Sequence, residues 1–106
     1  MKAVFRVDEA GAEQEGTFFT GEIVSGILVP GMEAVTAIGA VEVASIMNTT
    51  RTKEKKRALP TQQVCLISAR GYSPSALVEL KGQKLEFTDQ KTILLKKGIF
   101  LNAEPG

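Results

Sequence analysis

The chain has 106 residues, of which 43% are hydrophobic and 24% are charged, as in one ordinary globular domain. It carries 13 Lys and Arg against 12 Asp and Glu, so the net charge of +1 gives no overall field toward nucleic acid, membrane or an acidic partner. The absence of His excludes Ser-His-Asp and Cys-His catalysis and His-ligated metals, and the single Cys excludes disulfide frameworks and zinc ribbons. We therefore expect no cofactor and no metal.

Glycine and proline divide the chain into short segments rich in Val, Ile, Phe, Thr and Leu, a pattern typical of strands joined by tight turns. Residues 2–8 predict a first strand, because alternation places Ala3, Phe5 and Val7 on one face. The polar, Gly-flanked residues 11–16 predict a loop after it.

Residues 17–24 predict a second strand, with Phe19, Gly21 and Ile23 on one face and Phe18 on the other. A glycine inside a strand often marks a bend or a place where another backbone approaches closely. We therefore expect either a bend or a close approach at Gly21.

Residues 33–38 and 41–47 predict two further strands, separated by Gly39. An amphipathic helix is a rival interpretation, since apolar residues also recur here at helical spacing. We favour strands because Gly39 interrupts the pattern and because β-branched residues such as Val41 and Val43 prefer extended structure.

The remainder of the chain predicts a polar basic loop over residues 49–61 and an apolar central strand over residues 62–68. A loop over residues 70–75 precedes two predicted hairpins, one pairing 76–81 with 83–88 and the other pairing 92–96 with 98–102. Eight or nine short strands imply an all-β fold, a closed barrel or a sandwich, because closure removes exposed edges.

The least charged stretch, residues 23–47, is broken by Glu33, Glu42 and Pro30, so we reject a membrane span. The first residues lack the apolar core of a signal peptide. We expect a cytoplasmic protein without membrane contact.

The segment Gly16–Met32 carries a specific order of features: a Gly, a short apolar strand, Thr-Gly, a charged and an apolar residue, then two further glycines. Two strands follow, ending in Val43–Ile46, then the charged loop Lys53–Arg57 and the apolar strand Gln63–Ile67. This order resembles the second domain of translational GTPases, the β-barrel typified by domain 2 of elongation factor Tu. The sequence departs from the family where Glu22 replaces a basic residue and where Leu59-Pro60-Thr61 replaces a glycine-containing turn.

The resemblance covers roughly residues 3–88 of a single domain spanning 1–106, and residues 89–102 lie beyond it or supply a closing hairpin. It implies a small closed Greek-key-like β-barrel of the translation-factor domain 2 type. It also implies contact with RNA or the ribosome. The nucleotide chemistry of the family does not carry over, because this chain contains no GTPase domain.

The one concentrated charge on the chain is the run over residues 51–57, in which five residues are basic and one is acidic. A flexible basic loop of this kind can grip phosphates through Coulomb attraction and counterion release, although charged runs are also common as solvated surface. A separate loop offers a ring for base stacking and a cation for phosphate. The candidate binding residues are Arg51, Lys53, Lys55, Lys56, Arg57, Arg70 and Tyr72.

Other motifs favour structural interpretations. The glycines at 16 and 21 lack the Lys of a phosphate-binding loop. Cys65 has no general base in an apolar strand, so we expect it to be buried and structural. The acidic loop Asp8–Glu15 is expected to be solvated.

The leading hypothesis is a non-enzymatic binding module in which the acidic loop and the basic loop form two oppositely charged ends. The basic end would contact RNA or an acidic protein surface. A second hypothesis is a protein–protein or homo-oligomeric scaffold that associates through the apolar residues 23–47. A third is an enzyme that uses only carboxylates.

Overall fold

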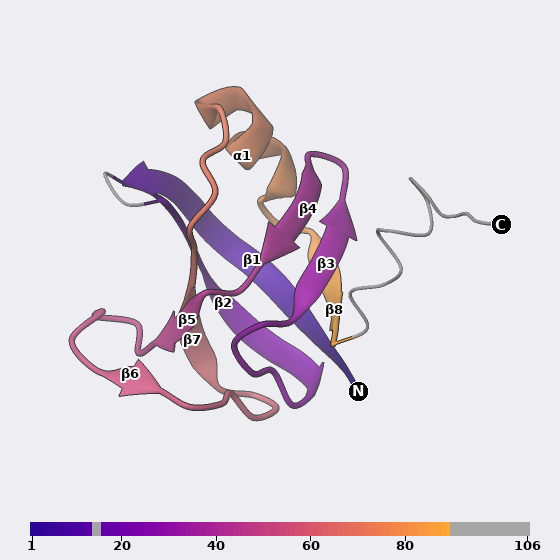
Figure 1. Ribbon diagram of the computed structural model, residues 1–106, viewed down its shortest axis with the longest axis vertical. Coiled ribbons are helices and arrows are strands. Elements are labelled where there is room, and N and C mark those ends of the chain that lie inside the picture. The colour runs from indigo at the N-terminus through magenta and orange to yellow at the C-terminus, as the bar shows by residue number, and fades with distance from the viewer. Residues whose placement is uncertain (14–15, 90–106) are drawn as a thin grey trace, which may run out of the picture.

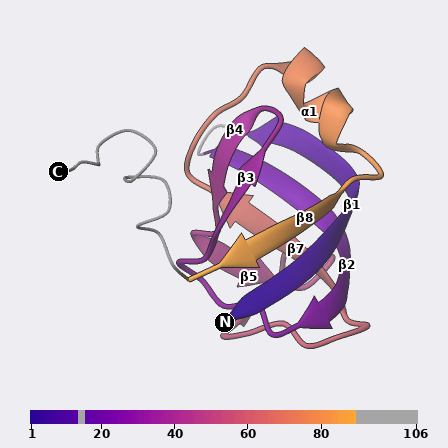
Figure 2. The ribbon, with the colours of Figure 1, turned by 90° about the vertical axis from the view of Figure 1, so that its right-hand side faces the viewer.

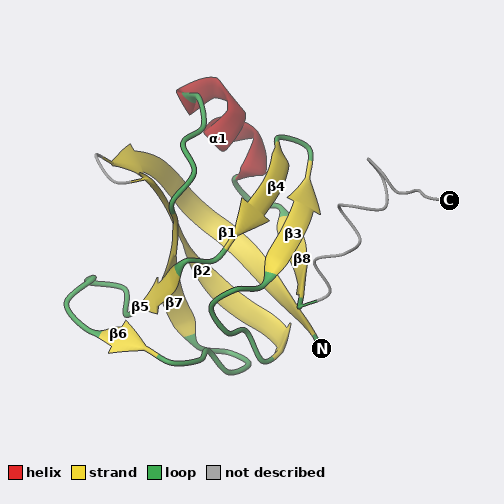
Figure 3. Cartoon of the chain, in the orientation of Figure 1, coloured by secondary structure: helices red, strands yellow, loops and turns green. Residues whose placement is uncertain are grey.

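The computed structural model describes residues 1–13 and 16–89 of the chain (Figure 1). Almost all regular structure in this part is antiparallel strand, with one short helix (Figure 3). The elements are β1 Lys2–Glu13, β2 Gly16–Gly26, β3 Glu33–Thr36, β4 Gly39–Glu42, β5 Ser45–Met47, β6 Glu54–Lys55, β7 Gln63–Ser68, α1 Pro74–Leu80 and β8 Lys84–Thr88. Strands in place of a helix over residues 33–47 are confirmed, but there are three rather than two, because β4 begins at Gly39 and Val43 and Ala44 separate it from β5.

The eight strands form one sheet in the order β4-β3-β8-β1-β2-β7-β5-β6. β4 and β5 stand near opposite ends of this order, yet only Val43 and Ala44 separate them in the chain. The sheet must therefore curl back on itself, and Figure 2 shows it wrapping around the interior. The backbone N–H of Ala44 donates to the carbonyl of Ile67 in β7 at 2.7 Å.

The curled sheet is an open half-barrel, so the predicted closure is not confirmed. β4 and β6 are the two ends of the strand order, and no ladder joins them within residues 1–13 and 16–89. Both end strands are short, at four and two residues. β4 is joined instead to the segment after β7, where the hydroxyl of Tyr72 donates to the carbonyl of Ala40.

The two longest strands, β1 and β2, form the hairpin on which the rest is built. The predicted inner face of Ala3, Phe5 and Val7 is confirmed, because all three are buried. The predicted loop over residues 11–16 is wrong in large part, since β1 continues through Glu13 and pairs with β2. Apolar alternation does not predict this extension, because the sequence becomes polar where the hairpin extends beyond the core.

Gly21 occupies the close approach that its position predicts. An added Cβ would overlap the carbonyl oxygen of Arg6 and lie 2.9 Å from Cζ of Phe5. Its predicted neighbours on the same face, Phe19 and Ile23, are both fully buried. This tight contact lets β1 and β2 pack over a shared core.

The core is formed by side chains from both halves of the chain. Residues 23–47, predicted as a stretch for self-association, instead supply much of this interior. Their buried members are Ile23, Leu28, Met32, Ala34, Val41, Val43 and Ile46. The exposed large apolar side chains of the described residues beyond Met1 are Val24, Ile27, Val35 and Val78, which lie on β2, its following loop, β3 and α1.

The predicted strand over residues 76–81 is wrong, because residues 74–80 form helix α1. Ser73 caps this helix by accepting a hydrogen bond from the N–H of Ala76 at 3.2 Å, and Pro74 occupies its first turn. Leu77 and Leu80 are buried at helical spacing. The Ser-Pro pair was the available helix signal.

The strand predicted over residues 83–88 is confirmed as β8, but its partners are β1 and β3 rather than residues 76–81. The central strand predicted over residues 62–68 is confirmed as β7, between β2 and β5. The predicted hairpin of 92–96 and 98–102 lies outside the described residues.

Candidate nucleic-acid interface

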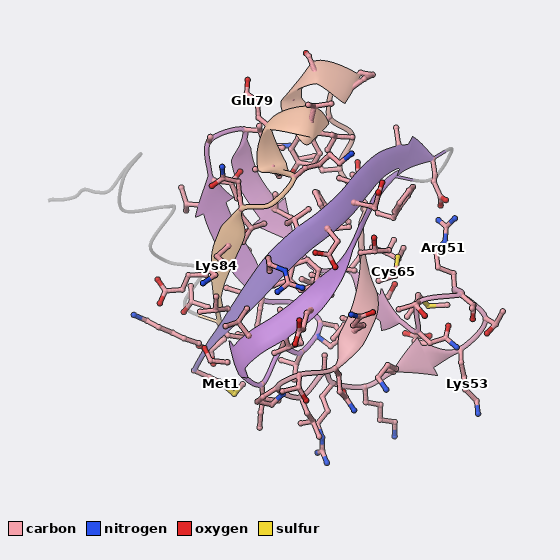
Figure 4. The ribbon with its side chains drawn as sticks, turned by 180° about the vertical axis from the view of Figure 1, so that it is seen from behind. Met1, Arg51, Lys53, Cys65, Glu79 and Lys84 are labelled. Atoms are coloured by element: carbon pink, nitrogen blue, oxygen red, sulfur yellow. The ribbon has the colours of Figure 1, made fainter. Side chains whose placement is uncertain are left out.

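The basic segment lies at one edge of the sheet, on strand β6 and the residues beside it. β6 pairs with β5 through Ile46–Lys55 and Met47–Glu54. Because paired residues share a face, Lys55 lies on the face of the buried Ile46, and Glu54 lies on the opposite face. Lys53 points away from the body of the molecule (Figure 4).

The turn that leads into this segment is held by Asn48. The Oδ1 of Asn48 accepts hydrogen bonds from the N–H groups of Thr52 at 2.8 Å and Lys53 at 3.1 Å. The N–H of Asn48 donates to the carbonyl of Lys53 at 2.9 Å, and the N–H of Arg51 donates to the carbonyl of Asn48 at 2.9 Å. The loop predicted as flexible therefore begins with a hydrogen-bonded turn.

Arg51 has a left-handed backbone, with φ of 58°, and its side chain turns back toward the β1–β2 hairpin. Its guanidinium forms an ion pair with the carboxylate of Glu13 and lies 4.6 Å from the centroid of the Phe18 ring. A cation over an aromatic face is attracted by the ring quadrupole. The side chain is therefore fixed by two partners.

This ion pair corrects the prediction that the acidic and basic loops form opposite ends. Glu13 belongs to the acidic loop and Arg51 to the basic run, and the two meet. The reason is the strand order, since β2, β7 and β5 are consecutive neighbours and place the hairpin end beside the β5–β6 turn. Glu13 and Arg51 are 38 residues apart, so no local sequence pattern predicts their contact.

Arg70 and Tyr72 form a second group, after β7. The guanidinium of Arg70 lies 5.8 Å from the centroid of the Tyr72 ring, which packs edge-on against Phe19 at 6.5 Å between centroids. Burial raises the pKa of the Tyr72 hydroxyl, and the nearby charge of Arg70 opposes that rise. No hydrogen bond or ion pair within residues 16–89 joins this group to residues 51–57.

A hollow of about 410 Å³ lies between β4 and the residues that follow β7. Glu33 and Glu42, which are register partners across β3 and β4, line it together with Ser68 and Arg70. No sequence motif indicates that these two carboxylates are close, because their proximity depends on the β3–β4 pairing. In the described part of the chain no group of three or more His, Cys, Asp or Glu side chains could hold a metal ion.

Cys65 is fully buried, as predicted. Burial raises the pKa of its thiol, while the charge of Arg51 and a backbone hydrogen bond at Phe19 lower it. A thiol in this environment stays protonated and is a poor nucleophile.

No helix in the described part of the chain has the length and apolar character needed to cross a membrane.

Comparison with known proteins tests the resemblance drawn from residues 16–67. The chain superposes on part of a bacterial selenocysteine-specific elongation factor with a TM-score of 0.64. The fold of this chain therefore resembles that of a translation-factor domain. The match covers 85% of this chain and 15% of that protein, at 18% sequence identity.

The superposition confirms the predicted resemblance to the domain 2 β-barrel of translational GTPases, and at this identity it concerns the fold alone. No family model matches the chain, and no curated protein sequence matches it.

Proposed function

We propose that this protein is a non-enzymatic, cytoplasmic RNA-binding module, a single domain over residues 1–106 that grips a phosphate backbone with its basic edge. The resemblance to a translation-factor domain favours an RNA partner. The half-barrel supplies a rigid support on which the cations are presented. Rigid scaffolds that present binding residues from loops and edges are common in proteins.

The observation that carries the proposal is the exposure and availability of the cations on and beside β6. Lys53, Lys56 and Arg57 are exposed, and Lys55 is half-buried. The ion pairs among residues 1–13 and 16–89 involve the N-terminus, Lys2, Arg6 and Arg51, and none involves these four side chains. Cations that are not already neutralised can replace condensed counterions on RNA, which is the main source of affinity for a nucleic acid backbone.

The test is a fluorescence-anisotropy titration with short single- and double-stranded RNA at two salt concentrations. The variant Lys53→Gln/Lys55→Gln/Lys56→Gln is compared with the matched control Lys2→Gln/Lys81→Gln/Lys84→Gln. Both variants lose three positive charges, but Lys84 lies on the other side of the molecule from Lys53 (Figure 4). The comparison therefore separates local contacts from net charge.

We expect the first variant to weaken single-stranded RNA binding strongly and to reduce the salt slope by about 2, at about 0.7 for each lost phosphate contact. The control should lower affinity only slightly and keep the slope. Equal losses in the two variants, or no RNA binding by the unmodified protein at low salt, would refute the proposal. Binding to an acidic peptide in place of RNA would indicate that the basic edge contacts a protein.

A further inference from the structure

The contact between Arg51 and Glu13 has the form of an occupied anion site. The guanidinium is held in place by the ring of Phe18 at 4.6 Å and by the left-handed turn at its own backbone. Phe18 is itself supported, because its ring lies across Gly11, where an added Cβ would stand 2.6 Å from the ring carbons. The cation is thus positioned by groups other than the carboxylate that it binds.

A carboxylate is the natural intramolecular substitute for a phosphate on arginine. The guanidinium presents a planar set of donors that fits either anion. The pair is open to water, with 39% of the Arg51 side chain and 42% of the Glu13 side chain exposed. An exposed ion pair is weak, so another anion can displace the carboxylate at low cost.

The surroundings favour a polyanion as the incoming group. Lys53 follows in the same turn, and a hollow of about 530 Å³ opens beside Arg51 and Glu13. Its walls include Gly16, Met47 and Ile67. Thr17, Ser45 and Thr50 also line it, so the hollow is of mixed polarity and can accommodate the sugar and base attached to a phosphate.

We propose that Glu13 occupies the place of an RNA phosphate on Arg51, so that binding exchanges this carboxylate for one phosphodiester of a single strand and seats the adjoining nucleoside in the hollow. Glu13 therefore limits RNA affinity. This inference rests on the proposed RNA-binding function and adds one subsite to it.

The experiment measures single-stranded RNA affinity and its salt slope for Glu13→Gln, with Glu9→Gln as the matched control. Glu9 lies four residues earlier on β1, on the same face by alternation, and is exposed. Both variants lose one negative charge, but only the first frees Arg51. We expect Glu13→Gln to bind RNA about threefold more tightly, with a salt slope steeper by up to about 0.7.

The double variant Glu13→Gln/Arg51→Asn tests whether the Arg51 guanidinium is the group that binds the phosphate. Asn removes the guanidinium yet tolerates a left-handed backbone, so the turn is kept. In this double variant the gain in RNA affinity seen for Glu13→Gln should disappear. Thermal unfolding of each protein checks that the fold is intact.

Equal gains from Glu13→Gln and Glu9→Gln, or a gain that survives the loss of Arg51, would overturn the subsite while leaving the basic edge in place. If neither the unmodified protein nor Glu13→Gln binds RNA at low salt, the proposed function itself fails. Tighter binding of Glu13→Gln to an acidic peptide but not to RNA would assign the site to a protein partner.

Discussion

The β1–β2–β7 side of the molecule and the β5–β6 edge are built on different physical grounds. The first consists of long paired strands whose inner faces are buried, and its contacts are apolar and close. The second consists of strands of three and two residues, and side-chain hydrogen bonds from Asn48 hold its turn. Burial stabilises the first region, and local polar contacts shape the second.

The difference teaches where function can be placed on this fold. Apolar packing sets the strand positions and tolerates little change. The segment between β5 and β7, which includes this edge, contains both residues with a left-handed backbone that are not glycine, Arg51 and Thr61, within the described part of the chain. Such conformations cost energy and commonly occur where a side chain must be presented in a particular direction.

The largest expected effect contrasts two adjacent phenylalanines on opposite faces of β2. Phe19 is 1% exposed and contacts the ring of Tyr72, whereas Phe18 lies on the outer face beneath Arg51. We expect Phe19→Ala to lower the free energy of unfolding by about 3–5 kcal/mol and Phe18→Ala by about 1 kcal/mol. Urea denaturation measures both. Similar losses would mean that the outer face is packed as tightly as the core.

The second effect concerns the close backbone approach at Gly21. A side chain there would overlap the carbonyl of Arg6, so we expect Gly21→Ala to cost about 3 kcal/mol through forced separation of β1 and β2. Gly71→Ala is the matched control, since an added Cβ at that site meets no atom within 4 Å. A Gly21→Ala protein as stable as Gly71→Ala would show that the strands separate freely at this point.

The sequence predicted the first region better than the second for a physical reason. Strand alternation is local, so the buried faces at Phe5 and Phe19 could be read from neighbouring residues. The pairing of Arg51 with Glu13 depends instead on the order of strands in the sheet, which no local pattern reports. The chain order of charges therefore predicted two separate ends where the fold makes one contact.

The helix α1 was missed although its signals were present. Ser73 and Pro74 form a helix start, and Leu77 and Leu80 lie three residues apart. The short apolar run also fits a strand, and the glycine after Lys81 suggested a hairpin. With a single helix of seven residues, periodicity cannot separate these alternatives.

The third effect is a gain in stability at the turn over residues 59–62. Thr61 has φ of 71°, and the N–H of Gln62 donates to the carbonyl of Leu59 at 3.1 Å. Proline followed by a left-handed residue is the arrangement of a type II turn, which favours glycine at the second of its two central positions, here occupied by Thr61. We expect Thr61→Gly to raise the free energy of unfolding by about 0.5–1 kcal/mol, because relief of the strain exceeds the added chain entropy.

Thermal unfolding checks this gain, with Thr49→Gly as the control. Thr49 does not have a left-handed backbone, so glycine there should only add entropy to the unfolded chain and lower the midpoint. A decrease in the midpoint for both variants would contradict the proposed strain at Thr61.

The last expected effect depends on pH and lies where the two regions meet, at Cys65 on β7. Burial raises the pKa of its thiol above the ordinary 9.0, so the folded protein holds the proton more tightly than the unfolded chain. The resulting stability is complete below about pH 9 and is lost as the pH rises through the folded-state pKa, at up to about 1.4 kcal/mol per pH unit. Urea denaturation between pH 7.5 and 10 should therefore give a steeper decline for the unmodified protein than for Cys65→Ala.

The difference between these two slopes isolates the thiol, because the two proteins share every other titratable group. Parallel declines would show that the thiol titrates alike in the folded and unfolded chains. Arg51 supplies a second check, since its charge lowers the pKa of Cys65. In Arg51→Asn that opposing charge is gone and the folded-state pKa rises further, so the decline in stability caused by the thiol should continue to higher pH. Such a change would demonstrate in solution that the edge turn is held over the long-strand side.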